Sequence, residues 1–112
     1  MKYHSEIFMP DNIKNAQIAT MLKYTHHAKQ EAQKDRIANL PRVLDTREMN
    51  LIEAVVEEDK FIKGVYRGAL DAARDISLVV DMDTGVVITV WANNKDDTHD
   101  TLDWSKYDTH VG

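Results

Sequence analysis

The chain has 112 residues, a formal net charge of −5, 43% hydrophobic residues and no cysteine. This length and composition predict one ordered domain, because a single hydrophobic core serves chains of this size. The lack of cysteine excludes disulfides, thiolate catalysis and metal centres held by cysteine. No apolar run approaches the roughly 20 residues that span a bilayer, and the first six residues lack the apolar core of a signal peptide. A cytoplasmic location without a membrane partner is therefore expected.

The first predicted element is a short strand or an extended arm. Residues 2–8 are rich in strand-forming side chains, and residues 9–12 interrupt them with turn-forming ones.

A helical tract follows, because apolar residues recur at helical spacing from residue 13 toward residue 37. Asp11 or Asn12 is expected to cap its beginning. Thr25 offers a second N-cap within this tract, so a separate helix beginning there is an open alternative. In that case Ala28 and Ala32 would form a narrow face that allows close packing.

Pro41 must end the helical pattern, since proline lacks an N–H and restricts the residue before it. A further helix is predicted over residues 46–57, with Thr46 as N-cap and Glu48 near the positive end of the helix dipole. Its buried side would consist of Leu51, Ile52, Val55 and Val56.

From residue 60 the apolar period changes from 3.6 to 2, which predicts strands over residues 60–67, 75–82 and 86–92. Residues 81–85 supply the aspartates and the glycine of a tight hairpin turn, so the last two strands are expected to pair antiparallel. The predicted class is α+β, with N-terminal helices packed on an antiparallel meander of three or four strands.

Short motifs in this pattern resemble the RelE-like group of small ribonucleases and toxins, which also gathers barnase-, EndoU- and colicin-type domains. The matching residues are His27-Ala28, Arg36-Ile37, the segment "VITVW" of residues 87–91, and Asn93. The resemblance covers about residues 25–93 and implies a RelE-like fold. It would also fit a protein encoded by a phage or another mobile element.

Active members of that group cut RNA without a metal, so the resemblance implies a metal-independent endoribonuclease. Such chemistry needs a proton acceptor, a proton donor and a cation for the developing phosphorane charge. His27, Arg36 and Thr89 are the positions that the resemblance carries over. On a straight helix His27 and Arg36 would point to opposite sides, which makes His26 the better partner of Arg36.

Substrate-binding residues are expected around the tip of the last strand. Trp91 offers a stacking surface for a base, and Asn93 and His99 follow it in the sequence. Tyr66 and Arg67 on the neighbouring strand could contribute from the side. Each strand aromatic has the alternative of a plain packing role.

The C-terminal stretch from residue 94 to residue 112 is acidic and includes the segment "DDTHD". Its spacing matches no EF-hand or zinc motif, so we expect neither a metal nor another cofactor. Leu102, Trp104 and Tyr107 are apolar anchors, which predict that this tail docks on the domain or on a partner.

Charge is distributed unevenly along the chain. Residues 1–47 contain eight basic and five acidic residues, a balance of +3, whereas the remaining 65 residues carry −8. RNA would approach the N-terminal part, because affinity for polyanions comes from Lys and Arg. The acidic half favours an alternative function, a non-catalytic module that binds a protein partner as an inhibitor or a DNA mimic does. The sequence leaves catalysis and the oligomeric state open.

Overall fold

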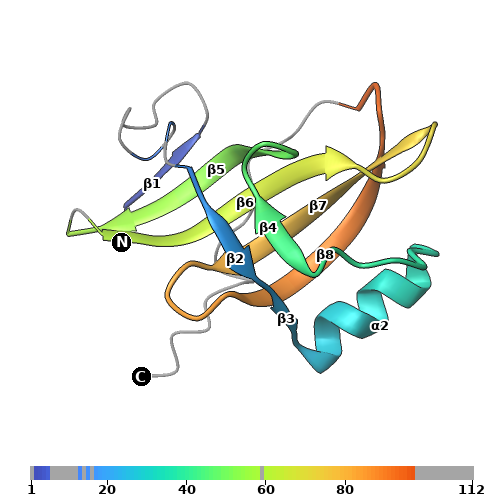
Figure 1. Ribbon diagram of the computed structural model, residues 1–112, viewed down its shortest axis with the longest axis horizontal. Helices are drawn as coiled ribbons and strands as arrows, with labels where there is room; N and C mark the ends of the chain where they lie inside the picture. The colour runs from blue at the N-terminus through green and yellow to red at the C-terminus, as the bar shows by residue number, and fades with distance from the viewer. Residues whose placement is uncertain (1, 6–12, 14, 16, 59, 98–112) are drawn as a thin grey trace.

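A computed structural model describes residues 2–5, 13, 15, 17–58 and 60–97 (Figure 1). The elements are, in chain order, β1 (Lys2–Ser5), β2 (Ala19–Met21), β3 (Lys23–Tyr24), α2 (His26–Lys34), β4 (Val43–Asp45), β5 (Met49–Glu57), β6 (Lys60–Ala69), β7 (Arg74–Asp81) and β8 (Val86–Asn94). A six-stranded sheet has the order β1-β5-β6-β7-β8-β3, and β2 pairs with β4 in a separate two-stranded ribbon. The α+β class expected from the sequence is confirmed.

The meander β5-β6-β7-β8 is antiparallel throughout, and β3 joins its β8 edge in parallel. The three strands predicted after residue 60 are confirmed as β6, β7 and β8, as is the antiparallel pairing of the last two. In the turn between them, the Asp81 carboxylate accepts hydrogen bonds from the N–H groups of Asp83 and Thr84. Gly85 completes the turn at a φ of 74°, a conformation that side chains disfavour.

The helix predicted over residues 46–57 is wrong, because this segment forms β5 between β1 and β6. A register shift between Leu51 and Glu53 places one extra residue, Ile52, in β5 and interrupts its alternation, which leaves an apolar spacing that resembles that of a helix. Thr46 caps no helix: its Oγ1 accepts a hydrogen bond from the N–H of Ile18 at 3.0 Å.

The continuous helix predicted over residues 13–37 is also wrong. Residues 19–21 and 23–24 are the strands β2 and β3, and the alternative helix beginning after Thr25 is present as α2. The Thr25 hydroxyl accepts a hydrogen bond from the N–H of Ala28 at 3.0 Å, which satisfies one free donor of the first turn. The expected caps Asp11 and Asn12 lie outside the described residues.

The two faces of the sheet carry different neighbours. On one face, α2 and the β2–β4 ribbon pack over the meander, and Figure 1 shows α2 beside β8 and β3. The buried residues of this layer are Leu22, Ala28, Ala32, Ile37, Leu44, Met49, Tyr66, Ile76, Leu78, Val80, Val87 and Val90. On the other face Val55, Val65 and Val79 form a separate buried cluster.

None of the helices in the described part of the chain is both long and apolar enough to cross a membrane.

Candidate functional site

The proposed acid–base residues lie at the beginning of α2, on its solvent side. The side chains of His26 and His27 are exposed, and the His26 ring nitrogen Nε2 lies 3.1 Å from the amide nitrogen of Gln30. The face of α2 that meets the sheet consists instead of Ala28 and Ala32, which are 0% and 2% exposed. Both histidines therefore point away from the sheet.

Arg36 follows the end of α2 and takes a left-handed backbone conformation, with a φ of 56°. The N–H of Ile37 donates to the carbonyl of Ala32, and the N–H of Arg36 donates to that of Gln33. These two bonds form a Schellman motif, which satisfies carbonyls at the helix end. Because Arg36 lies beyond the helix, the angular argument that paired it with His26 does not apply.

Thr89 lies on the opposite face of the sheet from α2. It is 5% exposed and pairs across the strands with Val79, which belongs to the buried cluster of that face. The neighbours of Thr89 on β8 that face α2 are Val87 and Val90. The sheet thus separates the Thr89 hydroxyl from His26 and from His27.

Three of the predicted substrate-binding residues share the face of Thr89. Arg67, Ser77 and Trp91 form one row across β6, β7 and β8. Asn93 lies one step further along β8, and its Oδ1 accepts a hydrogen bond from the Ser77 hydroxyl at 2.9 Å. The structure therefore brings Thr89, Trp91, Asn93 and Arg67 together on one face.

The guanidinium group of Arg67 already forms hydrogen bonds with other residues of this chain. It donates to the carboxylate of Asp75 at 2.9 Å, to the carbonyl of Asp97 at 2.8 Å and to the carbonyl of Asn94 at 3.0 Å. Lys95 adds a second cation to Asp75 at 2.9 Å. These bonds hold the turn after β8 in place, so Arg67 has a structural role. Few of its N–H donors are left for a phosphate.

The remaining predicted residues do not join this group. Tyr66 is 1% exposed and lies in the core beneath α2, where burial raises the pKa of its phenol. It is a packing residue, the alternative that the sequence left open. His99 lies outside the described residues. Among the residues that the structure does describe, no group of three or more His, Asp or Glu side chains could hold a metal ion.

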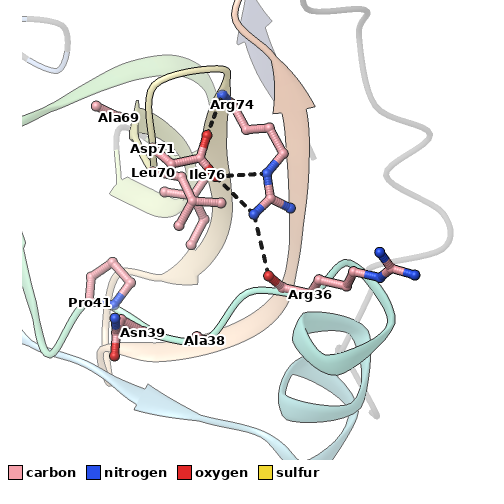
Figure 2. A pocket seen from close by; sticks show the side chains of 9 residues that line it. All are labelled: Arg36, Ala38, Asn39, Pro41, Ala69, Leu70, Asp71, Arg74 and Ile76. Atoms are coloured by element: carbon pink, nitrogen blue, oxygen red, sulfur yellow. Dashed lines mark hydrogen bonds and ion pairs between the residues drawn. The ribbon is translucent and has the colours of Figure 1, made fainter.

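The structure also shows a hollow of about 270 Å³ that sequence reasoning missed (Figure 2). It lies between the coil after α2 and the turn joining β6 to β7, and its lining is Arg36, Ala38, Asn39, Pro41, Ala69, Leu70, Asp71, Arg74 and Ile76. Figure 2 shows the Arg36 guanidinium pointing away from the other lining residues, with its carbonyl turned toward Arg74.

Arg74 forms hydrogen bonds to the segments on both sides of this hollow. Its guanidinium donates to the Asp71 carboxylate at 2.9 Å, to the carbonyl of Asp35 at 2.7 Å and to the carbonyl of Arg36 at 3.3 Å. The end of α2 is thereby fastened to the β6–β7 hairpin. The spacing of Asp71 and Arg74 around a turn is a local sequence signal. The bonds of Arg74 to the end of α2, however, connect residues nearly 40 positions apart.

Comparisons with protein-family models, with curated proteins and with solved structures gave no match to this chain. The resemblance to RelE-like proteins accordingly stays a prediction.

Proposed function

We propose that this chain is a non-catalytic module that binds a protein partner. The observation that carries the proposal is the separation of the candidate catalytic groups. His26 and His27 are exposed on the outer side of α2, whereas Thr89 is buried on the far face of the sheet. General acid–base catalysis needs a proton acceptor and a proton donor that reach one bound substrate at the same time, each within hydrogen-bond distance of its own atom.

The charge distribution supports a partner with a basic surface. Residues 48–112 carry −8, a net charge that repels RNA and attracts a basic protein. Arg67, one of the predicted substrate-binding residues, is already engaged with a carboxylate and backbone carbonyls.

The metal-independent endoribonuclease that the RelE-like resemblance implies is the competing proposal. Incubation of the purified protein with total RNA in EDTA separates the two. We expect no cleavage above that of a His26→Ala/His27→Ala variant. Cleavage that this double variant loses, with its fold intact by circular dichroism, would establish the ribonuclease in place of the binding module.

The partner itself can be tested with two matched charge changes. Asp83 and Glu31 each form one surface ion pair, Asp83 with Lys60 at 3.2 Å and Glu31 with Lys34 at 3.3 Å. Affinity capture from the native cells should recover a protein with the wild type and with Glu31→Lys. Recovery should fall with Asp83→Lys, which reverses a charge in the acidic half. Equal recovery with both variants would contradict the proposed role of that half.

A further inference from the structure

The face of the sheet away from α2 is buried, although its cluster contains only residues of the sheet. Val55, Val65 and Val79 are each 0% exposed. Their partly buried neighbours are Ile52, Ile88 and Trp91, which also lie on β5 and β8. Within the described part of the chain, this cluster receives no residue from α2 or from the β2–β4 ribbon. A buried sheet face requires another layer over it.

Ile13, from the N-terminal part of the chain, packs on the other side of the sheet. Ile13 is 6% exposed and forms a cluster with Ala54 and Val56 of β5. Successive side chains of a strand point to opposite faces of the sheet. Ala54, which pairs with Gly64, thus faces away from its neighbours Glu53 and Val55. Ile13 therefore belongs to the side that α2 covers.

The C-terminal part leaves the described structure at the buried face. Arg67 lies on this face, and it donates hydrogen bonds to the carbonyls of Asn94 and Asp97. Asn94 also donates its N–H to the Asp97 carboxylate at 3.3 Å. These contacts turn the chain after β8 toward Arg67, with the segment of residues 98–112 still to follow.

The length and pattern of that segment suit the face. Four strands spaced about 4.8 Å apart are roughly 15 Å across, and an extended chain covers about 3.3 Å per residue. Residues 98–112 are therefore long enough to cross the meander. Leu102, Asp103, Trp104 and Ser105 alternate apolar and polar, which directs two large side chains to one side of an extended chain.

We propose that residues 98–112 dock across the face of β5–β8 that lies away from α2, with Leu102 and Trp104 against Val65 and Val79. Trp91 and Thr89 then contact this chain's own C-terminal segment, and neither is open to a base while the segment is docked. The proposal rests on the burial of the face and is independent of the proposed function.

The absence of cysteine makes a direct test possible, because one introduced cysteine is the only attachment point for a spin label. A nitroxide on Trp104→Cys, and separately on Tyr107→Cys, should broaden the methyl NMR signals of Val55, Val65 and Val79 most strongly. The methyls of Leu78, Val80 and Val87 on the α2 side should broaden less. A nitroxide on Lys29→Cys, at an exposed position of α2, should give the reverse order.

Two results would overturn the proposal: stronger broadening on the α2 side from both C-terminal labels, or no broadening on either face. A second experiment without a spin label controls for any effect of the nitroxide on docking. With Trp104→Phe, Trp91 is the remaining tryptophan, and adding Leu102→Asp should make its fluorescence more accessible to acrylamide. Unchanged accessibility of Trp91 in a folded Trp104→Phe/Leu102→Asp protein would equally count against docking.

Discussion

Arg36 occupies a backbone conformation that glycine normally fills. A left-handed conformation costs a residue with a side chain roughly 1 kcal/mol. At this position the Schellman bonds of Arg36 and Ile37 impose it. The Arg36 guanidinium group does not offset this cost by a contact in the hollow, since Figure 2 shows it directed away from the hollow.

Arg36→Gly should therefore stabilise the fold. We expect the free energy of unfolding to rise by about 0.5–1 kcal/mol, because relief of the backbone strain exceeds the added freedom of the unfolded chain. Urea denaturation measures this change. Arg36→Ala is the control, since it removes the side chain but keeps the strain, and it should not stabilise. A stabilising alanine would point to the side chain as the cause.

Asp75 joins the two cations of the turn after β8. Its pKa lies below the ordinary value, because hydrogen bonds from Lys95 and from Arg67 favour the ionised carboxylate. A lowered pKa in the folded state means that this contribution to stability is complete above about pH 4, the ordinary value for aspartate. It is lost as the pH falls through the lower, folded pKa.

Asp75→Asn should accordingly weaken the pH dependence of stability on the acid side. The variant is expected to be less stable than the wild type above pH 4, and the difference should shrink as the pH falls below that value. Urea denaturation across this pH range provides the measurement. Asp83→Asn is the control and should follow the wild type, because the Asp83 side chain is 67% exposed.

At the scale of elements, α2 depends on one residue at its beginning. The Thr25 hydroxyl accepts from the N–H of Ala28, and it donates to the carbonyl of Ile88 on β8 at 3.2 Å. At the other end Asp35 accepts a hydrogen bond from the N–H of Ala92 at 2.8 Å. Side chains of the helix ends thus satisfy backbone groups along the β8 edge, which would otherwise be open.

Thr25→Ala should cost about 1–2 kcal/mol of stability, since it removes the cap and the bond to β8 together. Thr25→Ser keeps both bonds and should recover most of the loss. Hydrogen exchange at Ala28 would show whether the cap is responsible, with faster exchange expected only in the alanine variant. Equal losses with serine and alanine would instead implicate the packing of the threonine methyl group.

At the scale of the whole molecule, the β2–β4 ribbon belongs to the core layer on one side and meets solvent on the other. Leu44 is 0% exposed in the layer beneath α2. Its neighbour Val43 and the paired Met21 are 45% and 76% exposed. This two-stranded ribbon is held to the sheet by such buried side chains, because isolated pairs of strands are marginally stable.

Leu44→Ala should therefore destabilise the whole protein by about 2–4 kcal/mol, the usual cost of a cavity in a core. Val43→Ala, one residue away on the exposed side, should change stability by less than about 0.5 kcal/mol. Thermal unfolding of both variants checks the difference. Similar effects of the two substitutions would mean that the ribbon is not packed on the meander.

Elements with strong local signals could be predicted from the amino-acid sequence. Alternation and the turn at residues 81–85 defined β6, β7 and β8, and Thr25 with Ala28 and Ala32 marked α2 as one of two alternatives. β5 was misread as a helix, because an extra residue at Ile52 breaks its alternation and both of its faces are buried. β2 and β3 were missed because they are short and their partners are distant in the chain.

For the candidate site, the sequence grouped Thr89, Trp91 and Asn93, since residues two apart on a strand share a face. The face of the sheet that α2 covers depends on packing between distant segments and could not be predicted in this way. The small side chains of Ala28 and Ala32 let the helix approach Val87 and Val90, which left Thr89 on the far side from His26 and His27. Register and layer arise from contacts between distant residues, and no pattern within a single segment encodes them.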